Sequence, residues 1–134
     1  SQGDPHPQLS PIEVIAVRAM FEALVTAAAE SGIRLTYVPV HYERAGFEDP
    51  EPTARQASFA MSADEFLAHF DRVSARRSDT INVGIGAHSL RAVSEAALER
   101  IARAAGDDVP MHIHIAEQPR EVAECVAALG GPPV

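Results

Sequence analysis

The stretch that decides the fold reads Met111-His112-Ile113-His114-Ile115-Ala116-Glu117-Gln118. Apolar residues alternate with histidines over its first five positions. This pattern predicts a β-strand with His112 and His114 on one face and the apolar side chains on the other. A buried imidazole must be hydrogen-bonded or bound to a metal, so each ring has two interpretations: a core histidine satisfied by a backbone carbonyl, or a functional ligand.

Position along the strand favours a functional role for His114. Active sites of parallel α/β folds lie at the carboxyl ends of their strands. His114 is near that end, and Glu117 follows in the turn to the next segment. His112 lies two residues deeper, and we expect it to be structural.

Two further buried strands are predicted upstream, at residues 33–40, which are mostly apolar and β-branched, and at residues 81–86. The predicted helices run from Pro11 to about Ser31, from Ser62 to about Val73, from Leu90 to Ala105 and from Pro119 to Leu129. Capping boxes beginning at Ser10 and Ser62 open the first two helices. Residues 41–61 form a long predicted loop. Strands that alternate with helices indicate a parallel sheet.

The length of the chain limits the architecture. Its 134 residues fall well short of the roughly 250 of a complete (β/α)8 barrel. Three strands alone fit either a barrel segment or an open doubly wound sheet. The chain lacks an initiator methionine and ends in the turn-like sequence Gly130-Gly131-Pro132-Pro133-Val134. We therefore expect residues 1–134 to be an internal piece of a domain that is truncated at both ends.

Charge and composition exclude several classes of function. The net charge of −8 argues against nucleic-acid and anionic-membrane surfaces, and any anionic ligand must be held by a local cation. All eleven basic residues are arginines, which excludes a Schiff-base, P-loop or carbamylated lysine within this chain. The single cysteine, Cys125, is expected to be a buried, inert thiol, and it fits a reducing compartment such as the cytoplasm. No run of about 18 apolar residues occurs.

A second group of polar residues follows the predicted strand 81–86. Neighbouring parallel strands lie about 4.8 Å apart, so His88 would emerge beside His114 if the two strands pair. Arg91 lies one turn further on. The alternatives are a His88 that bonds its own loop and an exposed Arg91 in the first helical turn. A dinucleotide-binding glycine motif is not supported, because Ser89 stands where the third glycine would be.

The histidine strand resembles the fifth-strand signature of the amidohydrolase superfamily. In that signature the second histidine binds the catalytic metal, and the glutamate three residues later shuttles protons. The resemblance thus implies one Zn²⁺ with His114 as a ligand, Glu117 as the catalytic acid/base, and a TIM-barrel segment of about three parallel strands and four helices. The other metal ligands of the superfamily fall before and after this chain.

Within that superfamily the chain is most similar to the formiminoglutamate deiminase family. The similarity rests on Tyr37-Val38-Pro39-Val40 with Ala45-Gly46-Phe47, on Gly84-Ile85-Gly86-Ala87-His88-Ser89-Leu90-Arg91-Ala92-Val93, and on the histidine strand. In this family the histidine and arginine of the middle block line the substrate pocket, which implies substrate-binding roles for His88 and Arg91.

The activity implied by the resemblance is hydrolysis of a C–N bond in a linear amidine. N-formimino-L-glutamate and water would give N-formyl-L-glutamate and ammonia, a step of histidine degradation. The implied setting is a cytoplasmic, zinc-dependent homodimer that acts on a small anionic substrate, and the chain alone is expected to be inactive. Two alternatives stay open: a deaminase of the same superfamily acting on a nucleobase-like ring, and a non-catalytic α/β module.

Overall fold

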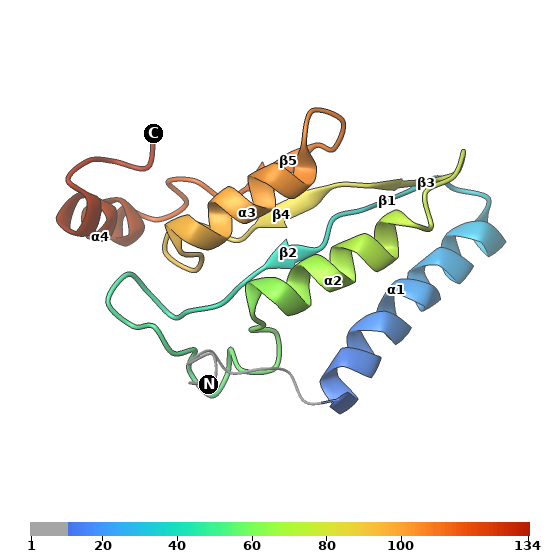
Figure 1. Ribbon diagram of the computed structural model, residues 1–134, viewed down its shortest axis with the longest axis horizontal. Coiled ribbons are helices and arrows are strands. Elements are labelled where there is room, and N and C mark those ends of the chain that lie inside the picture. The colour runs from blue at the N-terminus through green and yellow to red at the C-terminus, as the bar shows by residue number, and fades with distance from the viewer. Residues whose placement is uncertain (1–10) are drawn as a thin grey trace.

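A computed structural model describes residues 11–134, with side chains described from Val14 onward. Helices and strands alternate along this part of the chain (Figure 1). The elements are α1 (Pro11–Ser31), β1 (Leu35–Tyr37), β2 (Val40–His41), α2 (Ala63–Ser74), β3 (Ile81–Val83), β4 (Ile85–Ala87), α3 (Glu95–Ala105), β5 (Met111–Ile113) and α4 (Pro119–Leu129). None of the described helices is both long and apolar enough to cross a membrane.

The five short strands form three parallel lines. β1 pairs with β3 and β2 with β4 at the same register offset, and the amide of Gly86 bonds the carbonyl of Pro39 in the gap between the pairs. The first line is interrupted at Pro39, which has no N–H to donate. β5 adds to the free edge of β4, with Ile85 opposite Met111. The three predicted strands and their parallel pairing are thus confirmed.

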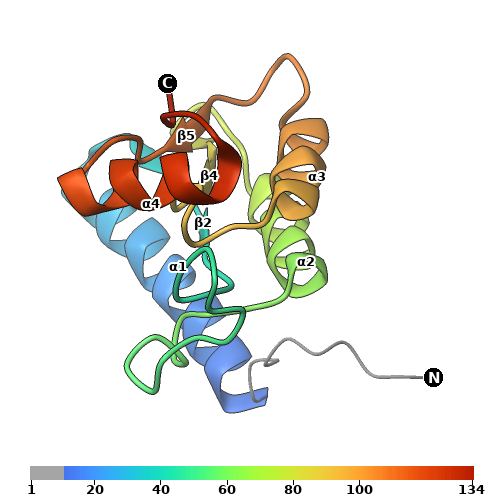
Figure 2. The ribbon, with the colours of Figure 1, turned by 90° about the vertical axis from the view of Figure 1, so that its left-hand side faces the viewer.

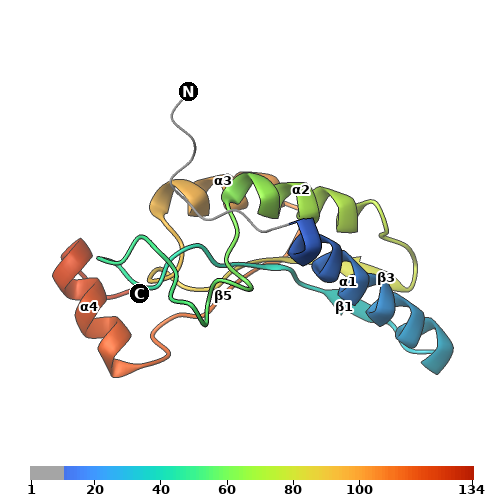
Figure 3. The same cartoon turned by 90° about the horizontal axis from the view of Figure 1, so that it is seen from below.

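Helices α2 and α3 lie on one face of these strands (Figure 3), and α1 joins the same core from the side of β1. No described helix covers the opposite face of β4 and β5, which we call the bare face. The core between the two layers joins Phe21 of α1, Phe66 and Phe70 of α2 and Ile101 of α3 to the strand residues Val83, Ile85 and Ala87. Helix α4 lies apart from the helical layer, across the carboxyl ends of the strands (Figure 2).

Alternation along the second line, formed by β3 and β4, decides which residues point into the helical core. Val83, Ile85 and Ala87 point into the helical core, so Gly84, Gly86 and His88 belong to the bare face. A Cβ on Gly86 would meet Cγ2 of Val40 at 3.0 Å, which places Val40 on the same face, where it is 42% exposed.

Local sequence signals correctly located several helix ends. The Ser62 hydroxyl accepts a hydrogen bond from the amide of Glu65, and the Glu65 carboxylate accepts one from the amide of Ser62, as the capping box predicts. Gly32 ends α1 with a φ of +69°, a left-handed conformation that suits glycine. The capping box predicted at Ser10 lies outside the described residues.

Two predicted boundaries are wrong. Helix α3 begins at Glu95 rather than Leu90, because the hydroxyl of Ser94 caps the amide of Ala97 and residues 90–93 form a turn. The strand predicted at residues 111–116 is β5, and it ends at Ile113 rather than Ala116, since Ala116 adopts a φ of +54° and turns the chain out of the sheet.

Candidate active site

Three aromatic rings from three neighbouring strands lie side by side at the carboxyl ends of the sheet. Tyr42 follows β2, His88 follows β4 and His114 follows β5, each one position beyond a residue paired in the sheet. The ring centroids of Tyr42 and His88 are 4.9 Å apart, and those of His88 and His114 are 5.0 Å apart. The prediction that His88 and His114 emerge at adjacent points is confirmed.

The side chains of His112 in β5 and of His114 directly after it are both exposed, whereas the sequence suggested buried rings. They lie on the bare face, which no described element covers. His112 sits over Gly84, since a Cβ on that glycine would come within 3.3 Å of its Nε2. His114 is tied to the neighbouring strand, because its Nδ1 and its backbone amide lie 2.9 and 3.1 Å from the carbonyl oxygen of His88.

The half-buried imidazole of His88 is held in its neutral form. Burial lowers its pKa from the usual 6.5, and the nearby positive charges of His114 and Arg91 lower it further. The carboxylates of Glu117 and Glu121 act in the opposite direction. A neutral ring can both donate and accept a hydrogen bond, which suits contact with a polar substrate group.

Arg91 lies in the turn between β4 and α3, and its side chain reaches across to the loop after β2. Its Nη1 donates to the carbonyl oxygen of Ala45 at 2.9 Å. It forms no ion pair with an acidic side chain within residues 14–134. Arg91 is therefore a partly desolvated cation with donors left for a ligand.

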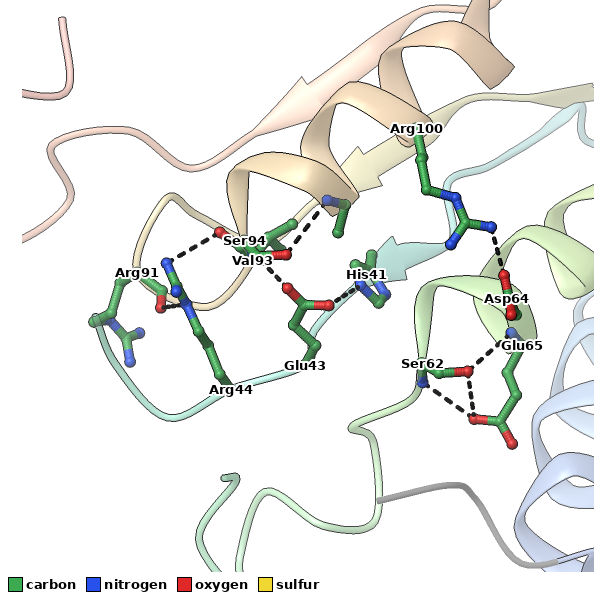
Figure 4. Close-up of polar contacts among 11 residues, drawn as sticks. His41, Glu43, Arg44, Ser62, Asp64, Glu65, Arg91, Val93, Ser94 and Arg100 are labelled. Atoms are coloured by element: carbon green, nitrogen blue, oxygen red, sulfur yellow. Dashed lines mark hydrogen bonds and ion pairs between the residues drawn. The ribbon is translucent and has the colours of Figure 1, made fainter. Parts of the chain in front are cut away.

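The structure adds one site residue that the sequence analysis missed. Glu43 is only 4% exposed and is the second residue after β2, and its Oε1 accepts a hydrogen bond from the amide of Ser94 (Figure 4). Its Oε2 is 3.2 Å from Nε2 of His41, which is fully buried. Burial by itself would raise the pKa of Glu43, but the hydrogen bonds from His41 and Ser94 lower it to about 2. The signal was present: Glu43 follows a buried strand, as His88 and His114 do.

Glu117 follows a strained turn that a buried carboxylate supports. Ala116 has a φ of +54°, which costs a residue with a Cβ roughly 1–2 kcal/mol. The amide of Glu117 donates to Oε2 of Glu121 at 3.0 Å, and Glu121 is 5% exposed. The side chain of Glu117 itself is exposed and lines a pocket.

This pocket has a volume of about 580 Å³ and lies at the carboxyl ends of the strands. It is lined by parts of the loop 45–56 after β2, by Arg91 after β4, and by parts of residues 117–128 after β5. The pocket thus brings Arg91 and Glu117 together, two of the four predicted site residues. His88 and His114 lie with Tyr42 in the row of three aromatic rings and do not line this pocket.

The charge in the pocket singles out Arg91. Five acidic residues line the pocket, namely Glu48, Asp49, Glu117, Glu121 and Glu124, against the two arginines Arg91 and Arg120. Nε of Arg120 lies 2.6 Å from Oε1 of Glu124 and is neutralised by it. An anionic ligand in this pocket therefore depends on Arg91.

Comparisons with known proteins agree with this geometry. No protein-family model matches the chain. Over 109 residues, or 81% of its length, the chain is 38% identical to formimidoylglutamate deiminase of Pseudomonas aeruginosa. Its fold matches the crystal structure of an amidohydrolase from Brucella melitensis with a TM-score of 0.73 and 33% identity, over 81% of this chain. The chain belongs to the amidohydrolase superfamily.

A second solved amidohydrolase relative is an adenosine deaminase from Xanthomonas campestris with bound zinc. It matches with a TM-score of 0.63 and 28% identity over 81% of this chain. The chain spans about a quarter of each relative: 24% of the Pseudomonas protein, 25% of the Brucella protein and 23% of the Xanthomonas protein. These relatives are TIM-barrel proteins, so the predicted fold class, a segment of a (β/α)8 barrel, is confirmed. The bare sheet face corresponds to the barrel interior.

The fit of this amidohydrolase segment to a metal rests on one side chain. Because the carbonyl of His88 can only accept, Nδ1 of His114 donates to it, and in the neutral imidazole the lone pair is then on Nε2, on the bare face. No three histidine, cysteine, aspartate or glutamate side chains within the described residues are arranged to hold a metal. His114 thus offers one nitrogen donor to a metal, whereas a catalytic zinc site takes three protein ligands.

Proposed function

We propose that the full-length protein hydrolyses N-formimino-L-glutamate to N-formyl-L-glutamate and ammonia, a step of histidine degradation. The observation that carries the proposal is that Arg91 and Glu117 line one pocket, in which Arg91 is the cation without an acidic partner among the described residues. A substrate with carboxylates at one end and an amidine at the other needs a cation to bind the carboxylates and an acid/base group near the amidine. The 38% identity to formimidoylglutamate deiminase supports it.

Each predicted residue has a distinct part in this reaction. Arg91 binds a substrate carboxylate through its guanidinium fork. His88, neutral at physiological pH, hydrogen-bonds the formimino group. Glu117 takes a proton from the attacking water and delivers it to the departing nitrogen, so that water adds at the formimino carbon and ammonia leaves. His114 would hold the Zn²⁺ ion, whose contribution when bound is to polarise the reacting groups and acidify water.

Activity of the full-length protein on N-formimino-L-glutamate tests the proposal, with ammonia release as the readout. We expect turnover by the wild type and a KM about 10- to 100-fold higher for Arg91→Ala, because a lost carboxylate contact weakens binding. Arg120→Ala is the matched control, since Arg120 lines the same pocket but is paired with Glu124. Absence of turnover in a zinc-loaded preparation would overturn the proposed substrate.

A second candidate is deamination of a nucleobase-like ring, which the likeness to a solved adenosine deaminase favours. Such a substrate carries no carboxylate for Arg91. Turnover of adenosine or a related ring that is insensitive to Arg91→Ala would therefore identify this second activity. A non-catalytic module remains the third reading, and it predicts no turnover of either substrate class.

The compartment, the oligomeric state and the binding partners are part of the same proposal. We propose a cytoplasmic homodimer that acts on a small anionic molecule and binds neither nucleic acid nor membranes. The negative net charge of the chain supports the last point. Sedimentation of the full-length protein tests the dimer, and the absence of a mobility shift with DNA or RNA tests the exclusion of nucleic acid.

A further inference from the structure

Two consecutive residues after β2 bind almost the whole backbone of one turn on the neighbouring strand. Side-chain nitrogens of Arg44 donate to the carbonyls of Leu90, Arg91 and Val93 at 2.9, 2.9 and 3.3 Å. The remaining carbonyl, of Ala92, accepts from the backbone amides of Glu43 and Arg44 at 3.0 and 3.1 Å. The amide of Ser94 then donates to the carboxylate of Glu43. Every carbonyl of residues 90–93 is thus bonded by this pair. Figure 4 shows Arg44 and Glu43 beside Arg91, Val93 and Ser94 of this turn.

These bonds are costly to arrange, which argues that they are not incidental. Glu43 is 4% exposed, and a buried carboxylate is stable only when its oxygens are hydrogen-bonded. His41, which supplies one of those bonds, is completely buried, and its other nitrogen, Nδ1, has no polar partner among residues 14–134. Capping a turn of backbone would need neither a buried charge nor a buried histidine.

The turn held in this way is the one that carries the predicted substrate-binding residues. His88 follows β4, two residues before this turn, and Arg91 lies within the turn. The carbonyl of Arg91 accepts from Nε of Arg44, and Nη1 of Arg91 donates to the carbonyl of Ala45. The loop after β2 therefore fixes both the backbone and the guanidinium of Arg91. Neighbouring strands of a barrel would otherwise leave this turn free at its tip.

We propose that Glu43 and Arg44 are positioning residues that hold the turn 90–94 and thereby set the orientation of Arg91 in the pocket. They act on substrate affinity through Arg91 and take no part in proton transfer. The kinetic part of this inference rests on the proposed function, whereas the structural part does not.

The structural part is tested by amide hydrogen exchange on the full-length protein. In Glu43→Ala we expect the Ser94 amide to exchange about tenfold faster or more, together with Ala92 and Val93, while amides within α3 stay protected. Glu43→Gln retains an acceptor oxygen and should preserve most of the protection. Asp64→Ala is the matched control, because Asp64 forms an exposed ion pair with Arg100 of α3 and does not contact the turn. Unchanged exchange at 92–94 in Glu43→Ala would overturn the inference.

The kinetic part is tested by a double-mutant cycle with Arg91. Glu43→Ala should raise KM about tenfold with kcat changed less than about threefold, and it should have little further effect in Arg91→Ala. Additive effects, or a loss confined to kcat, would contradict positioning through Arg91. If Glu43→Ala does not fold, Arg44→Lys serves instead, because lysine keeps the charge but not the fork that reaches three carbonyls. A protein inactive on N-formimino-L-glutamate would fail the proposed function while leaving the exchange result decisive.

Discussion

Nδ1 of His114 lies 2.9 Å from the backbone carbonyl oxygen of His88, so the residue after β4 sets the tautomer of the ring that follows β5. A carbonyl oxygen has no proton to give, and Nδ1 must therefore be the protonated nitrogen. In the neutral ring the lone pair is then on Nε2, on the bare face of the sheet. A metal-binding histidine needs this arrangement, in which one nitrogen is fixed by a hydrogen bond and the other is free to coordinate.

Replacing His114 should remove the metal. In the full-length protein we expect the wild type to bind zinc and His114→Ala to lose most of it, because the proposed assignment makes His114 one of the few protein ligands. Metal analysis of the purified proteins measures this. His112→Ala is the control, since His112 shares the strand face but lies over Gly84, deeper in the sheet. One tightly held zinc per chain in His114→Ala would refute the assignment.

Replacing Glu117 should slow chemistry and leave binding nearly intact. Glu117→Gln keeps the size of the side chain but cannot exchange a proton, so kcat should fall about 10²- to 10⁴-fold with a much smaller change in KM. Glu124→Gln is the matched control, as it removes another carboxylate from the same pocket. Steady-state kinetics of ammonia release distinguish the two. Equal losses in both variants would argue against a specific proton-transfer role.

Much of the fold could be predicted because it depends on local signals. The capping box at Ser62 and the glycine stop at Gly32 mark helix ends through their own hydrogen bonds and backbone geometry. The strand-end rule placed His88 and His114 together, since register carries forward along paired strands. Roles that follow from the resemblance, such as zinc binding by His114, stay predictions.

The errors have a common physical origin in contacts between distant segments. Helix α3 does not begin at Leu90 because the four carbonyls that would start it are bound by Glu43 and Arg44, about 50 residues earlier in the sequence. The exposure of His114 likewise depends on what covers the sheet, which a strand's own alternation does not reveal. Neither the bonds from Glu43 and Arg44 nor the exposure of His114 is marked by a periodic pattern in the sequence.

Glu121 should matter for activity because it holds the turn that carries Glu117. Its Oε2 accepts from the amide of Glu117, and its Oε1 is buried without a partner among the described residues. Glu121→Ala should release the strained turn at Ala116 and reduce kcat about tenfold, with zinc content unchanged. Glu121→Gln keeps an acceptor for the amide of Glu117 and should retain most activity. Full activity in Glu121→Ala would show that the turn holds without it.

Gly84 should resist substitution because three groups surround the site of its missing Cβ. An added Cβ would lie 3.0 Å from Cγ2 of Val38, 3.2 Å from the carbonyl of Pro110 and 3.3 Å from Nε2 of His112. Two neighbouring strands would have to shift, and we expect Gly84→Ala to lower the free energy of unfolding by about 1–3 kcal/mol. Denaturant unfolding measures the change. Gly131→Ala, which meets no atom within 4 Å, should cause almost none.

The buried charge of Glu43 should make stability fall in acid. Its pKa in the folded protein is about 2, against 4.5 when unfolded, so the folded state binds fewer protons between these values. The stability from its ionised form is therefore complete above about pH 4.5 and is lost as the pH falls toward 2. At neutral pH, Glu43→Gln should cost roughly 1–3 kcal/mol, the usual range for a hydrogen-bonded charge. The difference in Tm between the wild type and Glu43→Gln should then become smaller as the pH falls from 7 to 3.5. Asp64→Asn is the control, and its Tm should differ little from that of the wild type at every pH, since Asp64 is 79% exposed. A gap that stays constant over this range would mean that the folded carboxyl of Glu43 is not held ionised.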